Sequence, residues 1–344
     1  DLVTGVQTCA LPISVGEFRV DEGGQASYTI PLYVPPGTAG VQPKLSLSYN
    51  SGGGPGAMGK GWSLGGVSVM TRCRASREAG DFIAGGVPVD GDGGSVTFRQ
   101  KDRFCLDGQR LILVSTDKQY GDPDAEYRLE LDRFTRIYSR GGFNPTDPEV
   151  GSYTGPNYFE VQRRDGSTSY YGNTGDSYIE GNGRAFQVAT AWAMSRMLDS
   201  TGNYIDYEYE ENAGTGAEGE FVLRYVKYTG KISPAQSPYA TITLTYDTVA
   251  VREGYVGGSR ATRTRRLASI DVAGMRWYKL SYAASASGTG EDTLTSLKEC
   301  RDSSETVCYP ATSFAWTSAT QNYDSTGFRT DTGLEKMIDY RLGD

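Results

Sequence analysis

The chain has 344 residues, with 42 acidic against 34 basic side chains and a formal net charge of −8. This balance offers no broad basic field for nucleic-acid phosphates or anionic lipid headgroups, so neither is an expected partner. The sequence contains no histidine, which excludes Ser-His-Asp and Cys-His nucleophiles and His-containing zinc sites within these residues.

The composition favours an all-β fold. Glycine (45 residues) and tyrosine (24 residues) are abundant, as is typical of short strands joined by turns. We expect many short antiparallel strands and hairpins in a large sandwich-like or shell-forming β domain. No stretch approaches the roughly 18 apolar residues that span a bilayer, so no membrane insertion by this segment is expected.

The first residues differ in character from the rest. Residues 1–14 read DLVTGVQTCALPIS and resemble translated sequencing-adapter sequence, which is excluded from fold reasoning. We therefore expect 1–14 to be a non-native segment, the alternative being a genuine N-terminal strand.

A glycine-rich stretch from Pro43 to Gly66 organises the first part of the chain. Lys44–Asn50 alternates apolar and polar residues, which predicts a strand with one buried face. Glycines then crowd around Pro55 and predict a tight loop. Trp62 and Leu64 alternate again, so a second strand is expected.

The same loop contains two nucleotide-binding spacings. Gly54, Gly56 and Gly59 fit the dinucleotide fingerprint, and Lys60 follows as in a P-loop. Both motifs need a helix after the loop, whereas the next segment alternates like a strand, and Gly61 stands where a P-loop has its hydroxyl. We therefore reject both interpretations and expect no cofactor.

Turn signals recur along the rest of the chain. Asp-Gly supplies the two positive-φ positions of a type I′ turn and predicts two hairpins, Arg103–Leu106 with Gln109–Val114 and Tyr158–Arg163 with Ser167–Tyr171. A third is expected to join Leu267–Val272 to Met275–Tyr282 through Ala273 and Gly274. Further strands are predicted over Tyr204–Tyr209, Val222–Tyr228 and Ala240–Tyr246. Gln187–Leu198 fits a helix or a strand, and we interpret it as a strand.

Several of these motifs carry a resemblance. The run IPLYVPPGTAGVQPKLSLSYNSGGGPGAMGKGWSLGG resembles the opening of the N-terminal domain of the Salmonella plasmid virulence protein B family. That domain also begins Tc-type insecticidal toxin B subunits and many Rhs-like secreted proteins. The resemblance extends over residues 16–316 and continues through Phe104–Leu111, Tyr170–Glu180, Leu198–Asn212 and Thr295–Trp316.

The resemblance implies a domain plan and a function. Residues 15–316 would form the β domain, and 317–344 a polar tail leading into a missing downstream repeat domain. The domain would be a non-catalytic shell module of a secreted, extracellular virulence protein that helps to encapsulate or deliver a C-terminal toxin. Its partners would be downstream domains of the same polypeptide and other toxin-complex subunits.

Four cysteines remain once Cys9 is set aside with residues 1–14. Four cysteines allow three connectivities. From the short loop that Cys300 and Cys308 bracket, and from the resemblance, we predict the disulfides Cys73–Cys105 and Cys300–Cys308 in an oxidising compartment. The alternative is four buried free thiols.

One catalytic alternative stays open. Ser167-Thr168-Ser169 precedes Glu208-x-Glu210, and these elements resemble those of arginine-directed ADP-ribosyltransferases. Glu210 would stabilise the ribosyl transition state and Glu208 would activate the acceptor. Both acids alternate with tyrosines and read as the solvated face of a strand, so we predict no catalytic residue.

The remaining candidates have simpler interpretations. A surface carbohydrate- or receptor-binding module would use the polar loop 141–157. Asp90–Gly93 could hold Ca²⁺, but a hairpin turn is the preferred interpretation, so no metal is expected. For the one basic cluster, a solvated strand face is preferred over a phosphate site. The cluster consists of Arg260, Arg263, Arg265 and Arg266. We expect Trp62 and Trp192 to be structural anchors.

Overall fold

The computed structural model describes residues 16–75, 82–83, 87–88, 96, 98, 102–142, 155–180, 188–211, 219–256, 258–284 and 292–316. The predictions for 1–14, for Asp90–Gly93 and for 317–344 lie outside these residues, as do most of the loop 141–157 and nearly all of 212–219. Within the described residues the fold is all-β, as predicted, apart from the 3-10 turn η1 (Thr38–Gly40).

A small antiparallel sheet contains the glycine-rich stretch. Its strands pair in the order β1-β2-β3-β6, with bounds Glu17–Val20, Ala26–Pro31, Ser46–Asn50 and Trp62–Gly65. Leu47 and Trp62 are buried because the alternation of β3 and β6 points them to the same side. The two strands predicted on either side of the glycine loop are therefore confirmed.

The glycine loop itself forms a minute hairpin of β4 (Pro55–Gly56) and β5 (Gly59–Lys60). Gly59 and Gly61 have φ values of 82° and 80°, which a side chain would strain. A Cβ on Gly61 would lie 2.6 Å from the Tyr49 ring. No helix follows the loop, so rejection of both nucleotide motifs agrees with the structure.

Eight of the described strands close into a barrel. The path runs β15-β14-β13-β12-β11-β10-β7-β17, and β17 pairs back with β15. The bounds are β7 Val69–Cys73, β10 Arg103–Leu106, β11 Gln109–Leu113, β12 Glu126–Leu129, β13 Arg136–Arg140, β14 Tyr158–Gln162, β15 Thr168–Tyr171 and β17 Ala189–Leu198. A short strand, β16 (Tyr178–Glu180), also pairs with β17, and β8 (Phe82–Ile83) pairs with β9 (Val87–Pro88).

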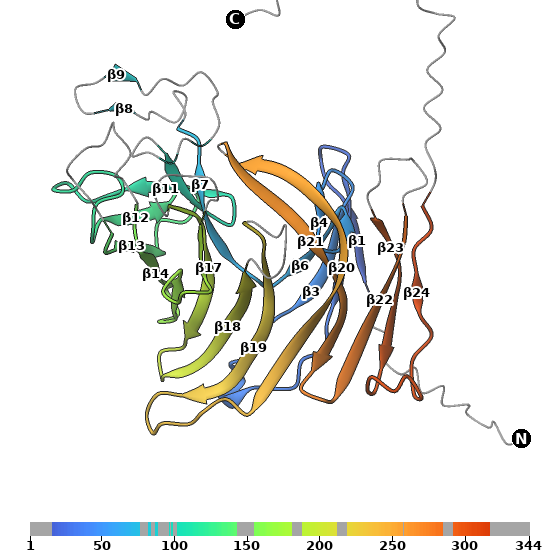
Figure 1. Cartoon of the computed structure of the whole chain (residues 1–344). Helices are drawn as coiled ribbons and strands as arrows, with labels where there is room; N and C mark the ends of the chain where they lie inside the picture. Colours follow the sequence, from blue (N-terminus) through green and yellow to red (C-terminus); the bar gives the residue numbers. More distant parts are fainter. Residues whose placement is uncertain are drawn as a thin grey trace, which may run out of the picture.

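From β17 the sheet continues as a long curved layer, β18 to β24, beside which β3, β4 and β6 lie (Figure 1). The bounds are β18 Asn203–Glu211, β19 Phe221–Lys231, β20 Ala240–Val256, β21 Ser259–Val272, β22 Arg276–Ala284, β23 Asp292–Cys300 and β24 Thr312–Ser313. The strand interpretation of Gln187–Leu198 is confirmed, since β17 occupies most of it. β20 and β21 are much longer than predicted, because their polar ends also pair.

A contiguous cluster of buried apolar side chains extends from Ile30 in the small sheet to Leu297 in β23. The small sheet packs on the curved layer through specific bonds as well. The Tyr278 hydroxyl accepts a hydrogen bond from the Tyr33 N–H at 2.9 Å, and the Leu267 N–H donates to the Ala57 carbonyl at 2.7 Å. The small sheet, barrel and curved layer therefore share one core.

Two of the three predicted hairpins have type I′ geometry. Asp107 and Gly108 both have positive φ, as do Ala273 and Gly274. The hairpin of β14 and β15 forms as predicted. The predicted type I′ turn is wrong for it, because only Gly166 of the Asp-Gly pair has positive φ. The loop is one residue longer than the predicted two-residue loop, because Arg163 pairs with Ser167. The Gly166 N–H donates to the Arg163 carbonyl and closes the turn.

Candidate functional site

A pocket of about 430 Å³, lined by both polar and apolar side chains, lies where the barrel joins the curved layer. At this place the pairing of β15 with β17 shifts register between Tyr170 and Tyr171, and such irregularities redirect side chains. The following loop, 172–177, then arches across β17 to reach β18. The Ser195 hydroxyl donates to the Asn173 side-chain oxygen, and the Asp176 carboxylate accepts the Tyr209 N–H at 2.7 Å.

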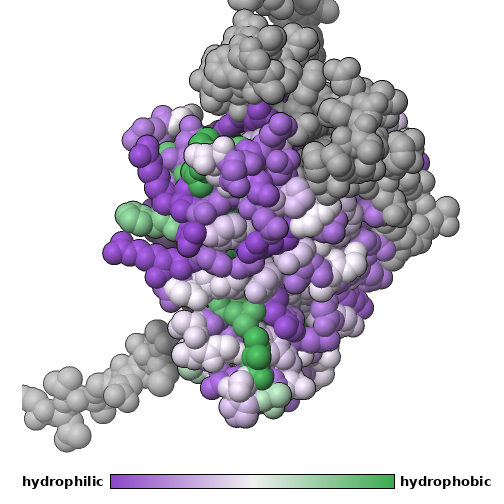
Figure 2. All heavy atoms as spheres, turned by 90° about the vertical axis from the view of Figure 1, so that its left-hand side faces the viewer, coloured by the Kyte–Doolittle hydropathy of each residue, from purple (hydrophilic) through white to green (hydrophobic). Residues whose placement is uncertain are grey.

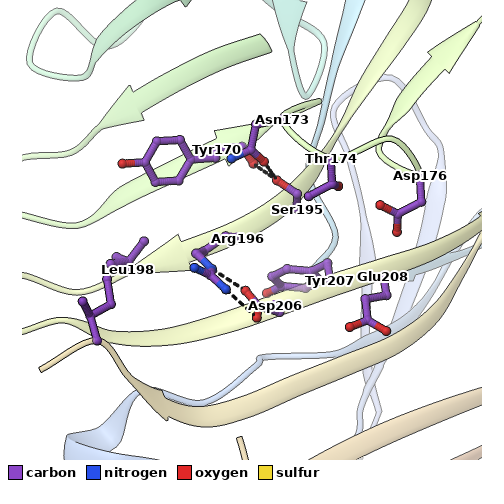
Figure 3. Close-up of a pocket in the computed structure, with 11 residues that line it drawn as sticks. Tyr170, Asn173, Thr174, Asp176, Ser195, Arg196, Leu198, Asp206, Tyr207 and Glu208 are labelled. Atoms are coloured by element: carbon purple, nitrogen blue, oxygen red, sulfur yellow. Dashed lines mark hydrogen bonds and ion pairs between the residues drawn. The ribbon is translucent and has the colours of Figure 1, made fainter. Parts of the chain in front are cut away.

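Two of the three carboxylates of the pocket, those of Asp206 and Glu208, are held in ion pairs, and Figure 3 shows the first of these. The Arg196 guanidinium donates to both carboxylate oxygens of Asp206, at 2.5 and 2.8 Å, and its cation lies 4.3 Å from the centre of the Tyr204 ring. The Glu208 carboxylate binds the Lys227 ammonium at 2.6 Å. These pairs fix the side chains in position, and the hydrogen bonds to Asp206 raise the pKa of Arg196.

The sequence did not single out this pocket. Tyr170, Asn173 and Ser195 appear in it only because the 172–177 loop crosses β17. Strand alternation indicates which face a residue occupies, but not which distant loop covers that face.

The structure does not assemble the residues of the ADP-ribosyltransferase alternative. Ser169 is buried on the barrel side and accepts a hydrogen bond from Arg163, whereas Glu208 points to the opposite face. Thr168 shares that face but pairs through Leu198 with Tyr204. Glu208 is four residues farther along β18, about 13 Å at the usual rise per residue.

Glu210 is also held in ion pairs. Its carboxylate contacts the Arg265 guanidinium at 3.0 Å and that of Arg224 at 3.7 Å. Both glutamates therefore act as partners in cross-strand ion pairs in this structure.

The basic cluster on β21 is divided among several contacts. Arg260 pairs with Glu253, and Arg263 donates to the Gly56 carbonyl at 2.6 Å. Arg266 lies 3.0 Å from Asp292. The expectation of a solvated face is wrong for Arg265 and Arg266, whose side chains are only 13% and 22% exposed, because Arg265 packs against Glu210 and Arg266 against Asp292 and the Tyr282 ring.

Both cysteine pairs are bonded in the structure. Cys73–Cys105 links the neighbouring barrel strands β7 and β10, with Cα atoms 5.9 Å apart. Cys300–Cys308 closes the loop that follows β23, with Cα atoms 3.9 Å apart. Among the described residues no cluster of acidic or cysteine side chains is arranged to hold a metal ion.

The two tryptophans lie in different parts of the core. Trp192 is fully buried in the barrel, where its indole N–H donates to the Pro156 carbonyl at 3.0 Å and its ring meets Phe159 at 5.0 Å. Trp62 packs between the small sheet and the end of the curved layer, 4.8 Å from the Phe314 ring. Both tryptophans are therefore buried in aromatic clusters of the core.

Three ionisable groups were missed by sequence reasoning, two of them almost completely buried and one partly buried. Arg72 points into the barrel with a side chain 1% exposed and lies 3.5 Å from Asp102, which is 2% exposed. At the end of β18, burial and then the nearby Glu180 and Asp176 carboxylates raise the pKa of Glu211 to about 7. Only three-dimensional pairing brings these groups together, so no local pattern marks them.

Fold and site together define an all-β, disulfide-linked module whose acidic and basic side chains are largely engaged with one another. A family model described as Salmonella virulence plasmid 65kDa B protein (SpvB) matches residues 20–233. The chain therefore belongs to the SpvB family, which confirms the resemblance. A comparison with curated protein sequences gave no match.

Solved structures share the fold. A crystal structure of TcdB2-TccC3 matches with a TM-score of 0.65 and 17% identity, over 88% of this chain and 17% of that one. A Tc holotoxin pore from Photorhabdus luminescens gives 0.64 and 17%, over 88% of this chain and 16% of that one. The N-terminal domain of the effector SpvB from Salmonella typhimurium strain LT2 gives 0.51 and 16%, over 84% and 99%. The chain thus spans 17% of the length of the TcdB2-TccC3 chain.

No helix among the described residues has the length and hydropathy needed to cross a membrane.

Proposed function

We propose that this chain is a non-catalytic structural module of a secreted toxin-complex protein. In this proposal it forms part of a shell that encloses or delivers a toxic enzyme carried on the same polypeptide. Its partners would be the downstream domains and other toxin-complex subunits. The family match, together with the fold shared with TcdB2-TccC3, is the observation that carries the proposal.

The strand pairing of the fold supports a role as part of a continuous wall. A closed barrel has no free sheet edges, and here it continues into the curved layer without a break in strand pairing. The Cys73–Cys105 disulfide links two strands of the barrel, and Cys300–Cys308 closes the loop after β23. We propose that residues 15–316 act as one unit of such a wall, with Trp62 and Trp192 as its anchors.

The surface supports an outward orientation for the barrel side. Figure 2 shows this side as mainly hydrophilic, with hydrophobic areas that are small and separate. Broad apolar patches mark interfaces with other proteins, so the visible side suits contact with solvent. The downstream domains would then pack elsewhere on the module.

Protease protection tests the proposal. The complete open reading frame that encodes this chain is expressed, and trypsin is added to the purified product. The proposal predicts that the C-terminal segment resists cleavage until the protein is denatured. Trp192→Ala, which opens a cavity in the barrel, should increase its cleavage, whereas rapid cleavage in the unmodified protein would exclude an enclosing shell.

A further inference from the structure

The pocket at the junction of barrel and curved layer has two chemically different ends (Figure 3). Tyr170 and Leu198 lie at one end, and Ile232, whose side chain is 52% exposed, also lines the pocket. Asp176 and Glu208 lie at the other end. The Arg196–Asp206 pair lies between them, so a ligand would meet both an apolar wall and a polar wall.

The charge of the pocket argues against an anionic ligand. Its walls include three carboxylates, those of Asp176, Asp206 and Glu208, and one guanidinium, that of Arg196. The Lys227 ammonium binds Glu208 at 2.6 Å, so three negative groups stand against two positive ones. The guanidinium is already bound by Asp206 through two hydrogen bonds. A phosphate or carboxylate would therefore be repelled by more charges than would attract it.

The polar groups of the pocket are instead suited to hydroxyl groups. Ser195 holds the side-chain oxygen of Asn173, an exposed residue, and so fixes the position of its amide group. The Arg196 guanidinium is fixed between Asp206 and the Tyr204 ring. Fixed donors and acceptors reduce the entropy lost when a ligand with several hydroxyls binds.

Size and shape fit the same chemistry. A volume of about 430 Å³ falls within the usual range for small-molecule sites and admits roughly one or two sugar rings. A sugar ring presents C–H groups on its faces and hydroxyls at its edge. The tyrosine ring offers a flat surface for the first, and the amide, carboxylate and guanidinium groups offer partners for the second.

We propose that this pocket binds a neutral saccharide, with Tyr170 against a face of the sugar ring and with Asn173 and the Arg196–Asp206 pair bonded to its hydroxyls. This binding activity goes beyond the structural role proposed above and does not depend on it. The site uses the 172–177 loop and the adjoining strands, and the residues that line it differ from those of the candidate loop named from the sequence.

Glycan binding tests the proposal with the whole 344-residue chain. The chain is applied to an array of neutral, sialylated and sulfated oligosaccharides, and affinity for the best neutral one is measured by titration calorimetry. We expect binding to neutral oligosaccharides. Tyr170→Ala should weaken it at least tenfold and Asn173→Ala at least threefold.

Tyr138→Ala is the matched control, because Tyr138 is partly buried on the same outer face, two strands from Tyr170, and does not line the pocket. It should change affinity less than twofold. Circular dichroism melting establishes that each variant is folded, and exposed Asn173 gives a readout even where Tyr170→Ala lowers stability. Absence of neutral-glycan binding, binding to anionic glycans alone, or equal losses in Tyr138→Ala and Tyr170→Ala would overturn the proposal.

Discussion

The buried ion pair of Arg72 with Asp102 should be a major determinant of barrel stability. Both side chains are almost completely inaccessible. The Arg72 guanidinium also donates to the Ala189 carbonyl at 2.7 Å, and Asp102 accepts the Phe98 N–H at 2.6 Å. Removing one partner would leave the other charge buried without compensation, which costs about 3–5 kcal/mol.

The pair can be measured by a double-mutant cycle. Arg72→Met should lower the free energy of unfolding by about 3–5 kcal/mol, and Asp102→Asn by a similar amount. The double variant leaves no buried unpaired charge, so its loss should be smaller than the sum by about 2–3 kcal/mol. Urea unfolding followed by tryptophan fluorescence is a suitable assay, because Trp192 lies 5.4 Å from the Arg72 guanidinium.

Arg19→Met is the control for this cycle. Arg19 also forms an ion pair, with Glu17, but its side chain is 73% exposed. Exposed pairs contribute little, so the urea midpoint should barely change. Losses below about 1 kcal/mol in both single variants, or losses that simply add, would refute the reasoning.

Four further predictions concern other parts of the molecule. The folded protein holds the Glu211 proton more tightly than the unfolded chain, so the protonated carboxyl contributes stability that is fully present below about pH 4.5 and is lost as pH rises through about 7. Glu211→Gln should therefore raise the urea midpoint relative to wild type at pH 8 but not at pH 4, and equal shifts at both pH values would contradict this. Replacing Cys73 and Cys105 by serine should cost about 4 kcal/mol, from a sequence separation of 32 residues, and alkylation of the native protein without reductant should label neither cysteine. Glu210→Gln should leave NAD consumption at the background of the unmodified chain, since Glu210 is bound by Arg265; NAD turnover that disappears in this variant would restore the enzymatic alternative. Trp62→Ala should lower stability by about 3–5 kcal/mol in thermal or urea unfolding, because it empties the contact between the small sheet and Phe314.

Local sequence predicted the elements of the fold better than their partners. Period-2 alternation and the turns at Asp107-Gly108 and Ala273-Gly274 are encoded by adjacent residues, so these hairpins were found. The closing pairs of β17 with β7 join Ala191 to Thr71. Alternation shows which face of such a strand is buried, but it does not identify a partner more than a hundred residues away.

The same limit explains the misjudged strand lengths and the unpredicted pocket. The outer arms of β20 and β21 are rich in charged residues, as in the pairing of Glu253 with Thr262. Such a stretch reads as loop when it is considered alone, because its stability comes from cross-strand contacts. The pocket depends in turn on Asp176 reaching the Tyr209 N–H, a tertiary contact with no local signature.

The most direct test of the structural account is electron cryomicroscopy of the complete product of the gene that encodes this chain. The account predicts a hollow particle in which the barrel and the curved layer form part of the wall, with density for a C-terminal enzyme inside. A product in which this module hangs free on a linker, or in which it surrounds no cavity, would contradict the account.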